Sequence, residues 1–200
     1  MCTAYEIGKK GVNFPKRISR KAVEELRAVK ERRLMRPTLM ASVVDLDGGL
    51  VKMRWGFRRE FSNAVVNARQ DKLKGRMWRE AMEERRCLIP AAAYYEWSGP
   101  KGAKRTHRFE SPAGEWLWIA GIWEEDVELG RCFSMITTEP RGAALGVHDR
   151  MPAVLSEEET GVFLDGGMWE FHPAAGLLEV RDAVNPLTGK APPPVQGELF

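Results

Sequence analysis

The chain has 200 residues, of which 44% are hydrophobic and 30% are charged, and its formal net charge is +3. This length suits one domain with a full hydrophobic core. No apolar run reaches the roughly 18 residues that span a membrane, and the N-terminus lacks the pattern of a secretory signal. We therefore expect a cytoplasmic, monomeric protein with no membrane partner.

The three cysteines, Cys2, Cys87 and Cys132, form neither a Cys-x-x-Cys pair nor an even set. This usage does not predict a disulfide framework, and it favours a reducing compartment. The three histidines do not lie close to the cysteines in the sequence, so we expect neither a metal site nor a cofactor. Cations are concentrated in residues 16–36, 52–59, 69–86 and 101–108, where each stretch has a solvated basic surface as its simplest interpretation.

The first predicted helix covers Lys21–Leu34, where apolar residues follow the 3.6-residue period after Ser19 as N-cap. Shorter helices are predicted near Met77–Glu84 and from Ser156 to about Leu164. Apolar or alternating runs predict strands at Cys2–Ile7, Ala41–Leu46, Leu50–Trp55, Val65–Arg69, Cys87–Trp97 (interrupted by Pro90), His107–Glu110, Trp116–Glu124, Cys132–Thr138 and Leu177–Val184.

Together these elements predict an α+β fold, a single domain over residues 1–184. Its core is expected to be a curved, barrel-like, mainly antiparallel β-sheet with flanking helices. The sequence Asp47-Gly48-Gly49 predicts a hairpin turn between two of the strands. Residues 185–200 contain four prolines and predict an extended tail.

Cys2 has chemistry that an internal cysteine lacks. Removal of Met1 would leave an α-amine, with a reference pKa of about 7.7–8.0, beside a thiol with a reference pKa of about 8.5. The amine of such an aminothiol attacks an aldehyde to give an imine, and the thiol then closes a five-membered thiazolidine. A cysteine at this position can also be accidental, so this interpretation depends on other residues.

Other stretches carry residue types suited to the same chemistry. Asn67-Ala68-Arg69 offers an amide and a guanidinium suited to phosphate. Glu96 lies in an aromatic and apolar run, where desolvation raises the pKa of a carboxyl. His148 has an ordinary pKa near neutrality, and Arg150 would share its face in an extended segment. Each residue also has a structural interpretation: a turn Asn, a solvent-facing Glu, a structural His and surface arginines.

Aromatic rings next to cations suggest a surface for nucleic acid. Arg54-Trp55-Gly56 places an indole beside a guanidinium, and Trp97 follows Glu96. Bases stack on such rings, and the cations bind the backbone. The structural alternative is that both tryptophans belong to the core.

The order of these motifs resembles that of the SRAP family, the SOS-response-associated, abasic-site-processing proteins. The resemblance runs from residue 2 to about residue 165. The motifs that carry it are Met1-Cys2, Arg54-Trp55-Gly56, Asn67-Ala68-Arg69, Arg86-Cys87-Leu88-Ile89-Pro90-Ala91, Tyr95-Glu96-Trp97, Ala120-Gly121-Ile122-Trp123-Glu124, Ile136-Thr137-Thr138 and His148-Asp149-Arg150-Met151-Pro152.

The resemblance implies a sensor that captures the aldehyde of an abasic site in single-stranded DNA as a covalent, reversible thiazolidine on mature Cys2. Asn67 would position the Cys2 backbone, Glu96 would transfer protons in formation and reversal, and His148 would assist sugar opening. The DNA-binding residues implied are Arg54, Trp55, Arg69, Trp97, Thr137 and Arg150. The resemblance also implies a damage-response role, a location on the nucleoid and an autopeptidase activity that removes Met1.

The chain departs from the family pattern next to the nucleophile. Gly-Arg usually follows the cysteine, whereas Thr3-Ala4 does so here, which removes a cation from this place. Asn-Ala-Arg usually continues as Ala-Glu, and here it continues as Gln70-Asp71. The segment before Tyr95 is rich in alanine. None of these changes removes a proposed catalytic side chain.

The last five residues, Gln196-Gly197-Glu198-Leu199-Phe200, resemble the peptides that dock into bacterial sliding clamps. Gln196, Leu199 and Phe200 would contact such a clamp, with the last two as apolar anchors. The structural alternative is a tail end that folds back on the domain.

Two other functions are compatible with the same residues. In a cysteine peptidase, Cys2, His148 and Glu96 would act as nucleophile, base and orienting residue. A peptidase, however, needs neither a free α-amine nor a basic groove. In a non-covalent binder of single-stranded DNA, Cys2 would be incidental.

Overall fold

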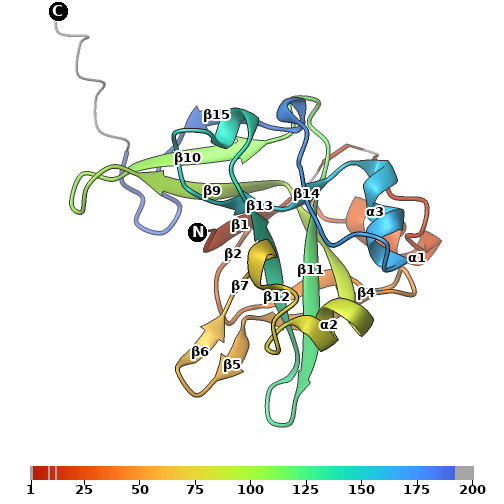
Figure 1. Ribbon diagram of the computed structural model, residues 1–200. Helices are drawn as coiled ribbons and strands as arrows, with labels where there is room; N and C mark the ends of the chain where they lie inside the picture. Colours follow the sequence, from red (N-terminus) through yellow and green to blue (C-terminus); the bar gives the residue numbers. More distant parts are fainter. Residues whose placement is uncertain (1, 9, 12, 192–200) are drawn as a thin grey trace, which may run out of the picture.

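Two β-sheets make up most of the protein (Figure 1), whose structure, a computed structural model, describes residues 2–8, 10–11 and 13–191. The first sheet has the order β15 (Glu179–Asp182), β10 (Arg105–Glu110), β9 (Ala93–Ser98), β1 (Ala4–Ile7) and β2 (Arg33–Met35). The second has the order β13 (Met151–Pro152), β12 (Gly130–Thr138), β4 (Leu50–Trp55), β3 (Met40–Val44), β8 (Arg86–Ala91), β11 (Leu117–Asp126) and β14 (Val154–Leu155).

Five strands of the second sheet form a closed ring. The ring runs β12-β4-β3-β8-β11 and closes because β11 also pairs with β12. Strand β12 runs parallel to β4 and to the short β7 (Asn67–Arg69), and the other pairs in the two sheets are antiparallel. Closure gives each strand of the ring a paired neighbour on both sides. The expected α+β class with a barrel-like, mainly antiparallel core is confirmed.

Both faces of the ring are buried, which explains the apolar run that begins at Cys87. In β8, Cys87 and Ile89 belong to one hydrophobic cluster and Leu88 belongs to the other, as the two-residue period of a strand requires. Helices α2 (Arg79–Glu84) and α3 (Glu157–Leu164) pack on β8 and β11 over the cluster that contains Leu88. The other cluster also contains Cys2.

The predicted interruption at Pro90 is wrong by two residues. Strand β8 continues through Pro90, which pairs with Trp118, and the chain breaks between the strands at Ala92. On its other side β8 pairs with β3 only at Leu88. The side of β8 that faces β3 therefore has few ladder hydrogen bonds for the missing N–H of Pro90 to interrupt. A sheet accepts proline at such a position.

The first predicted helix is shorter than the sequence period indicates. Helix α1 covers Arg20–Arg27, and the Ser19 side chain accepts the backbone N–H of Ala22, as expected of an N-cap. Residues 33 and 34, the end of the predicted helix, instead form β2 together with Met35 and pair with β1. This pairing buries Met35, a gain from tertiary structure that outweighs a weak helical pattern in a charged segment.

The hairpin predicted around Asp47 is confirmed, since β3 and β4 pair in antiparallel register. At the end of β4, Gly56 has a φ of 114°, and an added Cβ would lie 2.7 Å from Ala64 Cβ. This glycine allows the chain to turn into β5 (Phe57–Arg59) and β6 (Ser62–Val65), which form a separate two-stranded sheet.

Arg86 joins the helices to the ring. Its side chain is buried, and the guanidinium donates to four backbone carbonyls, those of Met82, Phe163, Gly166 and Met168. The ring centroids of Phe163 and Trp169 lie 5.1 and 5.5 Å from the guanidinium carbon. Because these carbonyls include ends of α2 and α3, Arg86 satisfies acceptors that helix termini leave without partners.

Among the described residues, none of the helices has both the length and the apolar character needed to cross a bilayer.

Candidate functional site

The pairing of β1 with β9 brings Cys2 and Glu96 together. Ala4 pairs with Tyr95 in antiparallel register, so the residues just before β1 lie alongside Glu96 and Trp97. Cys2 is fully buried, and its thiol donates to the carbonyl of Ala4 at 3.5 Å. Burial raises the pKa of the Cys2 thiol far above its ordinary value, and the charge of Glu96 adds to this effect. The thiol is therefore protonated at neutral pH.

Asn67 holds the backbone of Cys2 in place. Its amide nitrogen donates to the Cys2 carbonyl at 2.9 Å, and its residue position is set by the pairing of β7 with Met135 on β12. Asn67 itself is buried, and its Oδ1 accepts no hydrogen bond from the described residues. Asn67, in β7 of the second sheet, thus fixes the backbone of Cys2, which lies just before β1 of the first sheet.

Glu96 has the properties of a proton-transfer group. Its side chain is 2% exposed, and burial raises the pKa of its carboxyl from 4.5 to about 7. The charge of Asp149 raises this pKa further, whereas Lys104 opposes the shift. Both protonation states of Glu96 are consequently populated at neutral pH, as general acid–base catalysis requires.

His148 lies in the loop that precedes β13. Burial lowers the pKa of its imidazole below the ordinary value, and the nearby carboxylate of Asp149, 2.5 Å from Nδ1, partly opposes this shift. Nδ1 also accepts the backbone N–H of Arg150 at 3.1 Å. The Arg150 contact uses a lone pair on Nδ1, whereas the Asp149 contact requires a proton there, so the two contacts correspond to different tautomers of the ring.

An open pocket of about 370 Å³ adjoins these groups. Its lining residues are Thr3, Glu96, Trp97, Lys104, His148, Asn185, Leu187 and Thr188. Thr3 is the neighbour of Cys2, so the pocket opens beside the nucleophile. The structure thus brings together all four predicted catalytic positions, with Cys2 and Asn67 behind the pocket and Glu96 and His148 in its wall.

The predicted phosphate-binding arginines share one carboxylate. Arg69 donates through Nε and Nη2 to Asp71, both at 3.0 Å, and Arg150 lies 3.6 Å from the same side chain. Arg150 also donates to the carbonyl of Thr137 at 2.6 Å. The Arg69 side chain is half exposed, whereas Arg150 is buried beneath it.

Two of the predicted DNA-binding residues are core residues. Trp55 is fully buried, stacks on Phe133 with centroids 6.2 Å apart, and donates its indole N–H to the carbonyl of Val66. Thr137 is also fully buried, so its hydroxyl is not on the surface. Strands β4 and β12 direct both side chains into the core, and their contact with DNA stays a prediction.

Arg54 has a structural contact that the sequence motif does not reveal. Its guanidinium donates to the carbonyls of Gly56 and Asn63, at 2.6 and 3.0 Å, and so holds β6 against the end of β4. Trp97, in contrast, is partly exposed and lines the pocket.

Three pocket residues come from a segment to which the sequence assigns no function. Residues 185–190, predicted to start an extended tail, form a turn in which the Asn185 N–H donates to the carbonyl of Lys190 at 2.8 Å. Asn185, Leu187 and Thr188 of this turn line the pocket. Lys104 was detectable as part of the basic stretch 101–108, but no sequence pattern places the turn beside Glu96. In the described part of the chain, no three His, Cys, Asp or Glu side chains are grouped to hold a metal ion.

Comparisons with known proteins agree with this arrangement. The sequence model of the family described as SOS response associated peptidase (SRAP) matches residues 1–186. The abasic site processing protein YoqW of Bacillus subtilis is 31% identical over 148 residues, which cover 67% of this chain and 65% of that protein, slightly less than two thirds of its length. The abasic site processing protein YobE of the same organism is 29% identical over 58% of each chain.

Solved structures share the fold at lower identity. A protein from Bacteroides thetaiotaomicron superposes with a TM-score of 0.75 at 19% identity, with 96% of each chain covered. A phage-related protein from Bordetella bronchiseptica superposes with a TM-score of 0.69 at 21% identity, with 93% of this chain and 97% of that chain covered. Because the family model matches residues 1–186, the chain belongs to the SRAP family.

Proposed function

We propose that this protein captures abasic sites in single-stranded DNA through a thiazolidine formed by Cys2 after removal of Met1. The observation that supports it most is the position of Cys2. Asn67 holds its carbonyl, Glu96 with a pKa of about 7 lies beside it, and the pocket opens at Thr3. The names of the Bacillus relatives point to the same lesion.

The reaction begins at the amine of Cys2. The amine nitrogen attacks the aldehyde carbon of the ring-opened sugar, and water leaves to form an imine. The thiol then adds its sulfur to the imine carbon, and its proton passes to the nitrogen. Because burial keeps the thiol protonated, the amine is the first nucleophile and a base is needed for ring closure.

Glu96 is the group that transfers these protons. Its acid form protonates the departing hydroxyl, and its carboxylate accepts the thiol proton. Reversal follows the same path backwards: the C–S bond breaks, water adds to the imine and the aldehyde is released. The adjacent His148, whose imidazole lines the pocket, hydrogen-bonds to an oxygen of the opened sugar.

The direct test is incubation of the protein with single-stranded DNA that contains one abasic site. We expect a heat-stable adduct whose intact mass equals that of the protein without Met1, plus the DNA, minus one water. DNA retention without an adduct would indicate a non-covalent binder, and peptide cleavage without an adduct would indicate a peptidase.

Replacing Glu96 by glutamine is expected to slow both formation and reversal of the adduct, by roughly 10²-fold, because it removes general acid–base catalysis. Wild-type rates should change around pH 7, where Glu96 titrates, and rates of Glu96→Gln should lack this transition. Gel quantification of adduct against time at several pH values measures both quantities. A transition near pH 7 that persists in the variant would assign it to another group.

The same substitution has a consequence for stability. Because folding raises the pKa of Glu96, its stabilising contribution is complete below about pH 4.5 and is lost as pH rises through about 7. A shift of this size corresponds to roughly 2–4 kcal/mol at about 1.4 kcal/mol per pKa unit. Unfolding free energies measured from pH 4.5 to 8 should therefore fall more steeply for the wild type than for Glu96→Gln.

A sliding clamp is a second proposed partner. The peptide that resembles clamp ligands, with Gln196, Leu199 and Phe200, lies outside the described residues. Deleting residues 196–200 should abolish binding to a purified bacterial clamp, measured by calorimetry, and leave the adduct yield unchanged. Equal clamp affinity of the full-length and shortened chains would exclude this role.

A further inference from the structure

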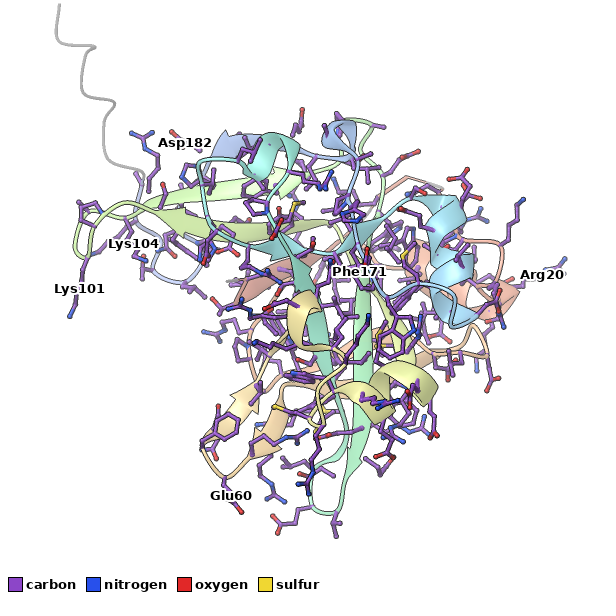
Figure 2. All side chains as sticks on the ribbon, viewed as in Figure 1. Arg20, Glu60, Lys101, Lys104, Phe171 and Asp182 are labelled. Atoms are coloured by element: carbon purple, nitrogen blue, oxygen red, sulfur yellow. The ribbon has the colours of Figure 1, made fainter. Side chains whose placement is uncertain are left out.

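The pocket beside Cys2 is bounded by two segments that the family motifs do not include. One is the β9–β10 hairpin, from which Lys104 lines the pocket just before β10 begins (Figure 2). The other is the turn of residues 185–190. Leu187 and Thr188 of this turn line the same pocket, and both lie beyond the residues matched by the family.

The turn is a defined wall, because its own hydrogen bonds close it. The backbone N–H groups of Thr188 and Gly189 donate to the carbonyl of Asn185, at 3.2 and 2.8 Å, and the Leu187 N–H donates to the Asn185 side chain at 2.9 Å. Ala183, two residues before Asn185, donates its backbone N–H to the carbonyl of Thr106 at 3.0 Å, which ties the segment to β10. Lys104 and the turn therefore keep a common position around the pocket.

Lys104 differs from the other cations near the site. Arg69 and Arg150 face Asp71, and Arg105, the next residue after Lys104, pairs with Asp182. No carboxylate among the described residues lies within ion-pair distance of Lys104. It is thus an exposed ammonium in the pocket wall whose charge is not neutralised by an ion pair.

The charge of Lys104 reaches the proposed catalytic groups. It opposes the burial that raises the pKa of Glu96, and it adds to the burial that lowers the pKa of His148. Lys104, Glu96 and His148 line the same pocket. An anion in the mouth of this pocket would therefore lie within reach of the Lys104 ammonium. In single-stranded DNA, the anions nearest to an abasic sugar are its own phosphates.

We propose that Lys104 binds a phosphate that flanks the abasic sugar and thereby positions the aldehyde at Cys2. The proposal rests on the proposed function and adds a binding residue to the same pocket. It also explains how the site has a cation beside the nucleophile although Thr3-Ala4 supplies none: the cation comes from a hairpin that is distant in sequence. Ala4 is fully buried and presents only a methyl group to the core.

The test compares Lys104→Met with Lys101→Met. Methionine removes the charge and keeps an apolar stem of similar length. Lys101 lies at the tip of the same hairpin, away from the pocket lining (Figure 2). The quantity measured is the DNA concentration that gives half the maximal rate of adduct formation. It is determined at salt concentrations from about 50 to about 300 mM, roughly the range in which phosphate contacts are resolved.

Lys104→Met should raise this half-saturating DNA concentration by about 3- to 10-fold. The slope of the logarithm of this concentration against the logarithm of the salt concentration should fall by about 0.7, the value for one phosphate contact on a single strand. The substitution should change the half-saturating DNA concentration more than the maximal rate of adduct formation. Lys101→Met should change both values by less than about twofold, and Lys104→Arg should restore the salt slope. A general disturbance of the fold would not be rescued in this way.

A second substrate separates this proposal from the proposed function. With a small uncharged aldehyde such as propanal, which carries no phosphate, the difference between Lys104→Met and Lys101→Met should be smaller than with abasic DNA and independent of salt, because only the effect of the Lys104 charge on Glu96 and His148 remains. If the wild type forms an adduct but Lys104→Met keeps the wild-type half-saturation and salt slope, Lys104 is not a phosphate ligand. If the wild type forms no adduct with abasic DNA, the proposed function is wrong, and the phosphate role of Lys104 in it falls with it.

Discussion

Replacing Cys2 by serine is expected to abolish the heat-stable adduct with abasic single-stranded DNA, with a loss of at least about 10²-fold in yield, since the nucleophile itself is removed. A serine hydroxyl does not close a stable ring on the imine, so the reaction stops at a hydrolysable C=N bond. Borohydride should trap this imine in Cys2→Ser, whereas the wild-type adduct should survive heat without a reductant. Denaturing gels with and without borohydride, followed by intact mass, measure both species.

The matched control is Cys132→Ser. Cys132 is also buried, and its thiol likewise donates to a backbone carbonyl two residues away, but it lies in β12 and not beside the pocket. It should form the heat-stable adduct at the wild-type level. A heat-stable adduct that survives in Cys2→Ser would falsify the thiazolidine assignment and would direct attention to lysine amines.

Replacing Arg86 by methionine is expected to lower the free energy of unfolding by about 3–5 kcal/mol. The change removes the Arg86 donor from four backbone carbonyls, of which that of Phe163 keeps the N–H of Gly166, and each buried acceptor left without any partner costs about 1–3 kcal/mol. One effect opposes the loss: burial lowers the pKa of Arg86 to about 10, so the charged form is itself destabilised by its surroundings. The lost hydrogen bonds outweigh this effect because they are several and charge-assisted.

Chemical denaturation of Arg86→Met, Arg86→Lys and Arg79→Met gives the measurement and its controls. Lysine keeps the charge but lacks the planar fork that reaches carbonyls of two helices, so Arg86→Lys should also be destabilised. Arg79 is 66% exposed in its side chain and pairs with the exposed Glu83, so Arg79→Met should change stability by less than about 0.5 kcal/mol. Equal stability of Arg86→Met and the wild type would show that the helices do not depend on this residue.

Arg86 also shows why a family motif does not reveal a role by itself. Its motif is in the sequence, but its acceptors at Phe163 and Met168 are about eighty residues away. The same holds for Arg54 and Trp55, where cation and indole beside each other suggest a DNA surface. Strand alternation turns Trp55 into the core and leaves Arg54 to bind backbone carbonyls.

What the sequence alone determined was local chemistry and class. The alternation and apolar runs predicted the strands of the ring, Ser19 and Ser156 predicted helix starts, and the order of motifs identified the family. The desolvation of Glu96 was one of two environments that the sequence left open, the other being the solvent-facing side of the strand, and its burial in the fold decided between them. The strands, the helix starts and the motifs depend on residues that are adjacent or close in the sequence, so they can be predicted from the sequence itself.

Tertiary structure alone decided which residues meet. Residues 33–35 became a strand because β1 was available to pair with them, and Thr137 was buried by the closure of the ring. The pocket joins Thr3, Lys104 and Thr188, whose proximity comes from the pairing of β1, β9, β10 and β15. Long-range pairing energies depend on the partner strand, and no local pattern contains that information.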